Sequence, residues 1–358
     1  MASSAKKEIS GIQRQFYTIA LIVVIIWVLM ITRGLLVPLA WASFFAIFMM
    51  PFVEWMESKR MRRGLAIIIA VLLFTGVIVG ILATLSAQVV SISKDLPSIS
   101  TRFSSSITKV QQFIVEDLGI ADDTEELKSM IGSQLEDVVK WLFGNITSVG
   151  QSFFDLFLMP IYIYFILLYR DLPSRFIEKK YSESNQETIR KVFGKIQKVL
   201  RSYIVGISLF TAITAAMDII IFLSLGLEYA LFFAILVAIL NLIPYVGNLI
   251  AMIIVVGYAL VTKDSLLTPL LLVGLLWLAN MIQENVIRPW VVGSSTEINA
   301  FAVFLSFIVG ALVWGVSGMI LFIPLVGIVK IILEEVPSLN AYAIFLKEWN
   351  VKPTEKKD

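Results

Sequence analysis

The stretch YALFFAILVAILNLIPYVGNLIAMIIVVGYALVT, residues 229–262, decides the fold. It has 34 residues and no charged side chain, and as one helix it would be about 50 Å long, well beyond the ~30 Å of hydrocarbon in a bilayer. Its centre runs from Asn241 to Asn248 and contains Pro244 and Gly247. Proline removes a backbone donor, and glycine and asparagine tolerate turn geometry. We therefore predict two short helices joined by a turn, forming a hairpin that enters the membrane and leaves on the same side.

The composition indicates a membrane protein. Of 358 residues, 58% are hydrophobic and only 16% are charged, and uncharged runs repeatedly reach the ~20 residues that cross a bilayer. Cysteine and histidine are both absent, which excludes disulfides, Cys/His zinc sites, haem ligation by His and any imidazole-based triad. The net charge is +2 and the Lys/Arg residues lie in the loops between apolar runs, so we expect no cofactor and no nucleic-acid partner.

Outward from residues 229–262, six other apolar runs have the length expected of a full span. The first could instead be a signal peptide, because Ala40 and Ala42 resemble a cleavage site. The apolar stretch continues to Pro51, however, which favours a retained span. The six predicted spans cover residues 16–31, 34–53, 65–90, 152–169, 203–225 and 265–283.

The charges of the loops predict a topology. Residues 54–64 carry four Lys/Arg, and residues 170–202 carry nine Lys/Arg against four Asp/Glu. Short basic loops of this kind stay in the cytoplasm. Residues 93–150 carry five Lys/Arg against nine Asp/Glu, which suits the outside. The N-terminus and the tail, residues 334–358, are therefore expected in the cytoplasm.

Two polar regions have apolar residues at three- and four-residue steps, which predicts amphipathic helices. In residues 93–150 we expect two such helices that pack on each other or on neighbouring subunits, with binding of an external ligand as the alternative. In residues 189–200 the apolar face opposes a basic face. That helix suits the surface of the anionic inner leaflet, with a regulatory partner as the alternative.

A second apolar run, residues 300–333, is again 34 residues long and again interrupted. A span followed by a broken run thus occurs twice, first entering from inside and then from outside. Inverted repeats of this kind are typical of secondary transporters, whose substrates bind between broken helices near the midplane. The alternative is that small residues and proline only pack or kink ordinary helices. The interrupting residues are Gly310, Gly315, Gly318 and Pro324, and Ser306 is one of the small residues, with these glycines, that would let the second hairpin approach closely.

The predicted fold is an all-α polytopic membrane protein. It has about six full spans and two broken re-entrant helical hairpins, with an inverted repeat in the C-terminal half. The predicted regions are scaffold spans one to three at 1–92, extracytoplasmic helices at 93–150, span four and a basic cytoplasmic helix at 151–202, a transport unit at 203–333 and a cytoplasmic tail at 334–358.

Two acidic residues are candidates for ion coupling. Asp218 lies well inside a predicted span, where an isolated carboxylate is costly unless it is paired or functional. A partner at a subunit interface, or a protonated acid, is the alternative. Glu284 is the second candidate and lies beside Gln283, Asn285 and Arg288. An Arg–carboxylate pair there could also simply hold the loop.

The first turn offers groups that suit a hydroxylated solute. Asn241, Tyr245 and Asn248 supply amide and hydroxyl groups next to Pro244 and Gly247. Taken singly, each of these residues could serve packing alone. As a set at one turn they predict part of a substrate pathway.

Three segments carry a resemblance to a known family. Residues 241–247 (NLIPYVG), residues 283–289 (QENVIRP) and residues 310–324 followed by Lys330 are similar in order and spacing to the autoinducer-2 exporter family of bacterial permeases. The resemblance covers the whole chain. Asn248 departs from the family pattern, which often places Pro after the glycine, and this puts the geometry of the tip in doubt.

The resemblance implies a bacterial inner-membrane secondary transporter, assembled as a homo-oligomer such as a pentamer. It would move a small polar solute or an ion outward by alternating access. Some members are associated with export of autoinducer-2 and others with sodium/proton exchange, so both functions stay open.

Two other classes of function remain as alternatives. A channel or the membrane subunit of an ATP-driven complex is one, although the chain has no Gly-x-x-x-x-Gly-Lys-Ser/Thr loop. An intramembrane enzyme is the other. It is disfavoured because the chain lacks a His for a serine protease and a second intramembrane Asp besides Asp218.

Overall fold

The computed structural model describes residues 11–112, 153–180, 183–243, 246–263, 265–292 and 298–348. These residues form helices, with one isolated bridge between Ile298 and Lys347, so the predicted all-helical class is confirmed. Most of the predicted extracytoplasmic region and the tip residues Pro244 and Tyr245 lie outside the described residues.

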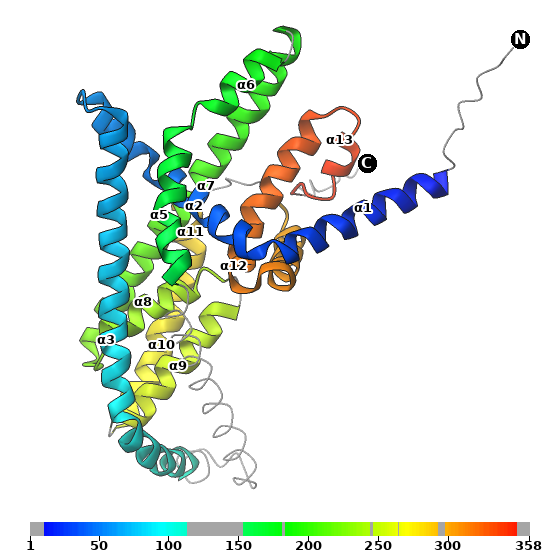
Figure 1. The fold of residues 1–358 in the computed structure, drawn as a ribbon. Helices are drawn as coiled ribbons and strands as arrows, with labels where there is room; N and C mark the ends of the chain where they lie inside the picture. Colours follow the sequence, from blue (N-terminus) through cyan, green and yellow to red (C-terminus); the bar gives the residue numbers. More distant parts are fainter. Residues whose placement is uncertain are drawn as a thin grey trace, which may run out of the picture.

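Most of the described helices follow one another with short connections, and residues 113–152 lie outside the described ranges (Figure 1). In the described ranges, five of them are long and apolar enough to cross a membrane: 33–58, 63–92, 189–224, 267–291 and 300–335. The elements are α1 (Gly11–Ile31), α2 (Arg33–Ser58), α3 (Arg63–Gln112), α5 (Phe153–Leu168), α6 (Leu172–Lys180), α7 (Glu183–Ser224), α8 (Ala230–Leu240), α9 (Val246–Thr262), α10 (Leu267–Ile282), the π-helical η3 (Gln283–Ile287), α11 (Arg288–Val291), α12 (Ala300–Glu335) and α13 (Asn340–Ala343).

Three helices extend further than the sequence predicted. α7 joins the predicted basic surface helix to span five without a break, so residues 189–200 prolong the span instead of starting a separate helix. No proline interrupts α7, and its glycines, Gly194 and Gly206, are tolerated inside it. α3 similarly continues through residue 112, and the span predicted to end at 283 continues to Val291.

Two of the six predicted spans fall on apolar helices shorter than the five long ones. α1 contains the predicted residues 16–31, and α5 covers 153–168 of the predicted 152–169. The 16 residues of α5 extend about 24 Å, somewhat less than the hydrocarbon thickness. The five long helices and the shorter apolar ones together contain all six predicted spans.

The first packed unit consists of α2, α3 and α5. Ala42 and Ala46 on α2 are fully buried, and these small side chains let the neighbouring helices approach closely. Ile67 on α3 and Leu167 on α5 are also fully buried in this unit. The unit forms a rigid block beside the broken helices.

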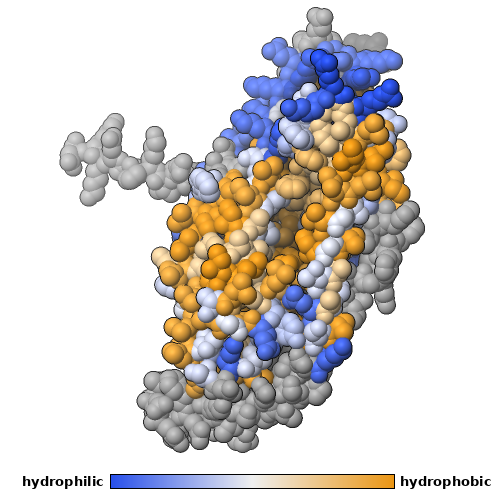
Figure 2. Space-filling model, turned by 90° about the vertical axis from the view of Figure 1, so that its left-hand side faces the viewer, coloured by the Kyte–Doolittle hydropathy of each residue, from blue (hydrophilic) through white to orange (hydrophobic). Residues whose placement is uncertain are grey.

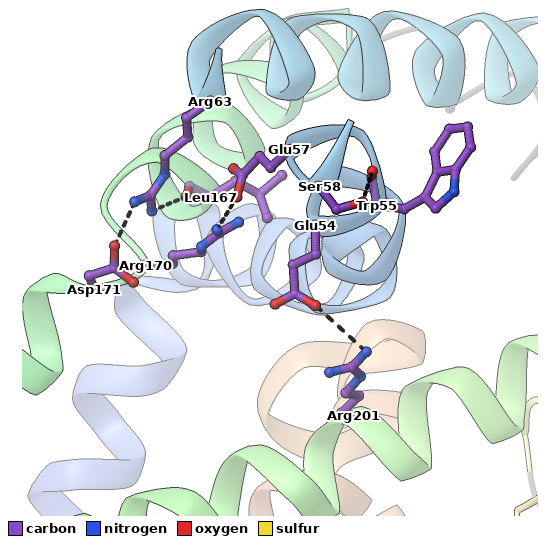
Figure 3. Close-up of polar contacts among 9 residues, drawn as sticks. All are labelled: Glu54, Trp55, Glu57, Ser58, Arg63, Leu167, Arg170, Asp171 and Arg201. Carbon is purple, nitrogen blue, oxygen red and sulfur yellow. Dashed lines mark hydrogen bonds and ion pairs between the residues drawn. The ribbon is translucent and has the colours of Figure 1, made fainter. Parts of the chain in front are cut away.

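Ion pairs join the helices of this block at the end that carries both basic loops (Figure 3). Arg63 Nη1 donates to Asp171 Oδ2 at 2.5 Å, and Arg63 Nη2 donates to the carbonyl oxygen of Leu167 at 2.9 Å. Arg170 Nη2 donates to Glu57 Oε2 at 2.5 Å, with both side chains largely buried. The α2–α3 turn and the α5–α6 turn are thus linked by ion pairs at one end of the molecule.

The second packed unit combines the end of α7 with α8, α9 and α10, which lie in the lower half of Figure 1. Phe222, Ala234, Val255 and Leu272 are fully buried there, one from each helix. The lower part of α3 packs on the same unit through Val89. This unit holds the first broken helix against both α7 and α10.

The surface is apolar over a broad middle band. Figure 2 shows hydrophobic side chains over the middle of the face that contains α3, and hydrophilic ones gathered at the upper end. The upper end contains α6 and the start of α7, where the basic loop lies (Figure 1). Large hydrophobic side chains such as Leu72 and Ile220 are about two-thirds exposed. Such a band matches a protein solvated by lipid.

Candidate functional site

One face of α7 carries polar groups into the interior. Phe210, Thr214, Asp218 and Phe222 follow one another at four-residue steps, so they share a face, and each is at most 1% exposed. Phe210 and Phe222 close off the two ends of this stripe. Thr214 and Asp218 are thereby held side by side in apolar surroundings.

The first predicted break is present next to this stripe. α8 ends at Leu240 and α9 begins at Val246, and the two helices pack against each other. Asn241, the first residue after α8, is 6% exposed. A Cβ atom on Gly247 would overlap the carbonyl oxygen of Leu240, so only glycine permits this close return of the chain.

A π-helical turn brings the next polar group to the same place. Gln283 begins η3, and the backbone N–H of Arg288 donates to its carbonyl five residues earlier. Pro289 explains the turn, because proline in a regular helix clashes with the carbonyl four residues earlier, and one extra residue relieves that clash. Gln283 is 2% exposed, whereas Glu284 and Asn285 face outward.

These three segments form one buried polar cluster. Gln283 Nε2 donates to Asp218 Oδ1 at 3.5 Å, and Asn241 Nδ2 donates to Gln283 Oε1 at 3.5 Å. Both hydrogen bonds are long. Three oxygen atoms of the cluster are buried without a hydrogen-bond partner: Thr214 Oγ1, Asp218 Oδ2 and Asn241 Oδ1.

The second predicted break lies inside α12. Gly315 has φ 61° and ψ −140°, a conformation that glycine alone adopts readily. Gly310 and Gly318 are eight residues apart, about 12 Å in a straight helix. Instead, a Cβ atom on either would overlap the backbone of the other. The chain therefore turns back on itself at Gly315, and Pro324 lies buried in the returning arm.

Both breaks pack into one central cluster, which we define by its buried residues Phe44, Tyr203, Ile204, Ile207, Phe210, Leu321 and Ile323. Leu242 from the first break and Trp314 from the second are packed against it. The Trp41 indole N–H of α2 donates to Ser317 Oγ at 3.1 Å, which fixes the second tip. Residues beside both breaks thus pack against the same central cluster.

The other predicted residues lie outside the buried polar cluster. Glu284 and Arg288 form an ion pair of 2.7 Å on the helix surface, and the guanidinium of Arg288 also lies 4.5 Å from the ring centre of Phe210. The Asn285 amide donates to the carbonyl of Met281. The buried Ser306 hydroxyl donates to the carbonyl of Ala302. The hydrogen bonds of Arg288, Asn285 and Ser306 are each made within their own continuous helical stretch, and the ring contact of Arg288 with Phe210 is the contact that reaches α7.

Thr214 is the residue that sequence reasoning missed. A threonine hydroxyl inside a helix usually bonds the carbonyl four residues earlier, as Thr211 Oγ1 does with Ile207 at 2.8 Å. Thr214 makes no such bond. Its position one turn before Asp218 is the sequence signal that could have identified it.

The arrangement offers ligands and no reactive group. It combines one carboxylate, two amides and a hydroxyl in a buried place beside the break between α8 and α9. Exposed backbone at such breaks is tolerated in a membrane where it is buried in protein or lines a cavity. This geometry suits reversible binding of an ion or a small polar solute.

A comparison with family models now decides the class. The model described as "AI-2E family transporter" matches residues 18–338. The chain belongs to the AI-2E family of transporters. This result confirms the resemblance, and it confirms that the protein is a transporter and not an enzyme.

Relatives of this AI-2E transporter match it almost end to end. The "AI-2 transport protein TqsA" of Escherichia coli (strain K12) is 26% identical over 338 residues, covering 93% of this chain and 95% of the relative. The YhhT protein of the same strain is 24% identical over 333 residues, covering 92% of each chain. The YrrI protein of Bacillus subtilis (strain 168) is 22% identical over 316 residues, covering 85% and 87%. The chain is accordingly a multi-pass membrane protein of a bacterial transporter family.

Proposed function

We propose that this AI-2E transporter is a secondary transporter that exports a small polar solute of the autoinducer-2 kind by alternating access. The observation that carries the proposal is that Leu242, beside the first break, and Trp314, beside the second, pack against one central cluster. Each break follows a long helix, α7 or the α10–α11 helix, as expected of two inverted units. The name of the relative TqsA supports the choice of solute.

Alternating access needs one unit that moves against another. α2, α3 and α5 form a scaffold tied by ion pairs, whereas α8, α9 and the two arms of α12 carry the breaks. We propose that the two hairpins are re-entrant and shift together against this scaffold, which opens the polar tips to one side and then the other.

Charge supports an orientation for the transporter in the bacterial inner membrane. The α2–α3 turn and the start of α7 carry the basic loops and lie toward the upper end of Figure 1, and α13 also lies in the upper half. Basic loops are retained in the cytoplasm. We propose that both termini are cytoplasmic and that the ends of α7 and α9 face outward.

A homo-oligomer is part of the proposal. α1 projects away from the rest of the molecule in Figure 1 and is apolar on all sides, with Phe16 67% and Trp27 61% exposed. The Trp314 indole N–H donates to the carbonyl of Leu29 at 3.0 Å and fixes only the end of α1. A second copy would cover the free length of α1. A monomeric mass for the purified transporter in detergent would contradict this assembly.

Sodium/proton exchange is the second candidate function. One observation favours it: Asp218 is 1% exposed, and its Oδ2 atom has no partner. A buried carboxylate within a membrane helix is the usual site of ion coupling.

Efflux from proteoliposomes of the purified transporter tests these functions. Autoinducer-2 efflux should occur with the native chain, fall at least tenfold in Asn241→Ala and stay unchanged in Asn340→Ala, a control outside the breaks that binds only the carbonyl of Glu334. Proton-driven sodium movement without solute efflux would instead establish the antiporter. The absence of both movements would leave transport dependent on a partner protein and contradict the proposal.

A further inference from the structure

Two ion pairs on different faces of α7 join this helix to its neighbours at the end that carries the basic loops. Lys195 Nζ donates to Glu335 Oε1 at the end of α12. Arg201 Nη2 lies 3.9 Å from Glu54 Oε2 of α2 (Figure 3). Six residues separate Lys195 from Arg201, which places the two side chains about 120° apart around the helix. α7 is therefore bound to α12 on one face and to the scaffold helix α2 on another.

Beyond these ion pairs, α7 enters the central cluster, which separates them from the buried polar cluster. The residues of α7 in the central cluster begin at Tyr203 and end at Phe210, so they occupy about 10 Å of the helix. Phe44 of α2 and Leu321 of α12 pack in the same cluster. Thr214 of the buried polar cluster follows one turn after Phe210. Apolar side chains of α2, α7 and α12 thus close the polar cluster toward the end with the basic loops.

The Lys195–Glu335 pair can break and re-form, because water reaches it. The side chain of Lys195 is 48% exposed and that of Glu335 is 16% exposed. Ion pairs near a surface contribute little to stability, so a transport cycle can open and close them. The neighbouring acid, Glu334, lies 3.5 Å from Lys330 and 3.4 Å from Lys347. Glu334 thus binds α12 to itself and to the tail, whereas Glu335 binds α12 to α7.

We propose that the Lys195–Glu335 ion pair is a latch that holds α12 against α7 and keeps the buried polar cluster closed to the cytoplasm. The inference rests on the proposed function, since it names the contact that breaks when the transporter opens inward. α12 carries the second break and belongs to the moving unit, whereas α7 is tied to the scaffold through Arg201. Opening then parts Leu321 of α12 from Ile207 of α7 and lets water into the central cluster.

The rate at which a buried cysteine reacts with an impermeant reagent tests the latch without any transported solute. The native chain has no cysteine, so Ile207→Cys, at a position that is 5% exposed in the central cluster, reports on this place alone. In inside-out membrane vesicles, a charged methanethiosulfonate should modify this cysteine slowly. Adding Glu335→Gln should raise the rate about fivefold or more, because α12 is then no longer held to α7. Exchanging the charges, with Lys195→Glu and Glu335→Lys, should return the rate to that of Ile207→Cys alone.

Glu178→Gln is the matched control. Glu178 pairs with Arg190 at 2.7 Å, and both side chains are about half exposed, but this pair joins α6 to α7 and does not involve α12. The rate for Ile207→Cys should therefore stay unchanged. Equal rates with Glu335→Gln and with Glu178→Gln would overturn the latch, and so would a charge-exchanged variant that reacts as fast as Glu335→Gln. If Ile207→Cys does not give a monodisperse protein, Leu321→Cys, at a 4% exposed position on the α12 side of the cluster, takes its place.

Efflux measured with the same variants separates the latch from the exporter proposal. Autoinducer-2 efflux by the native chain, together with a modification rate that does not respond to Glu335→Gln, would overturn the latch and leave the exporter standing. A rate that rises in Glu335→Gln and falls again in the charge-exchanged variant, without any solute efflux, would support the latch and contradict the exporter.

Discussion

Single residues decide how closely the broken helices can pack. Gly310 and Gly318 place backbone against backbone, and Gly247 does the same against Leu240. No side chain lies between these segments, so an added methyl group has nowhere to go. The glycines at the breaks are therefore required for packing as well as for turning.

We expect Gly318→Ala to destabilise the protein by about 1–3 kcal/mol or more, because its Cβ overlaps the backbone of Gly310. Gly274→Ala in α10 is the matched control, since a Cβ there meets nothing within 4 Å and the helix gains about 0.5–1 kcal/mol from the replacement. Melting temperatures of the two variants in detergent give the comparison. Equal melting temperatures would show that the two arms of α12 do not touch.

The Arg63–Asp171 ion pair makes a contribution to folding stability that depends on pH. The hydrogen bond from the Arg63 guanidinium lowers the pKa of Asp171, so its stabilisation is present above the unfolded pKa of about 4 and is lost as pH falls through the folded value. Asp171 is half-exposed, and because water screens exposed ion pairs, the pair contributes at most about 1 kcal/mol of stability. Asp171→Asn should therefore melt lower at pH 7, and its difference from the native chain should shrink as the pH falls below about 4. A constant difference at both pH values would contradict this account.

The chemistry of the site residues was readable from the sequence, but their contacts were not. Asp218, Asn241 and Gln283 were each predicted as pathway residues because polar groups in apolar runs stand out. Nothing in the sequence joins them, since they are separated by 23 and 42 residues and meet only after α7, α8 and η3 have packed. Thr214 was missed because its hydroxyl could have been satisfied within its own helix.

At the level of elements, breaks were easier to predict than continuity. Pro244, Gly247 and Gly315 mark both interruptions, because backbone geometry is local and these residues control it. The single helix α7 was predicted as two pieces, because its polar and apolar halves differ in composition while its backbone has no interruption. The π turn at Gln283 could not be predicted from Pro289 alone, because a kink would relieve the same clash.

The tail forms a clasp on α12. Asn299 Oδ1 accepts from the N–H of Ala302 at the start of α12, and its Nδ2 donates to the carbonyls of Phe345 and Lys347 at 2.8 and 3.0 Å. Lys347 Nζ lies 3.4 Å from Glu334 near the end of α12. The clasp, residues 340–347, therefore joins the start and the end of the same broken helix.

Two substitutions at Asn299 separate the helix cap from the clasp. Asn299→Asp keeps the acceptor for Ala302 but loses both donors to the tail, whereas Asn299→Ala loses all three hydrogen bonds. Both variants should expose residues 336–347 to protease. Only Asn299→Ala should lose the further ~1 kcal/mol of the cap. A tail that resists protease equally in both variants and the native chain would contradict the clasp.

At the scale of the whole molecule, the sequence predicted the class and left the assembly of the parts open. Composition and loop charge identify a multi-pass membrane protein because the bilayer constrains every span alike. Each of the six predicted spans lies on a helix of the structure, although α1 and α5 are shorter than the five long apolar helices. Which helices become neighbours depends on side-chain fit over long sequence distances.

Impermeant maleimide labelling of whole cells tests the orientation, and the native chain needs no engineering because it has no cysteine. Lys59→Cys in the basic turn should stay unlabelled until the cells are opened, whereas Glu228→Cys after α7 should label from outside. Asn248→Cys near the first tip should react with a small aqueous reagent, and Val77→Cys in the middle of α3 should not. Labelling of Lys59→Cys in intact cells would reverse the topology.

The clasp has a mechanical consequence. The two arms of α12 pack together near the tip at Gly310 and Gly318, and their open ends are joined through Asn299 and Lys347. We therefore expect the arms to tilt together as one body instead of separating. A displacement of the tail would then also move Trp314 at the tip, and with it the end of α1 that is bound through the carbonyl of Leu29.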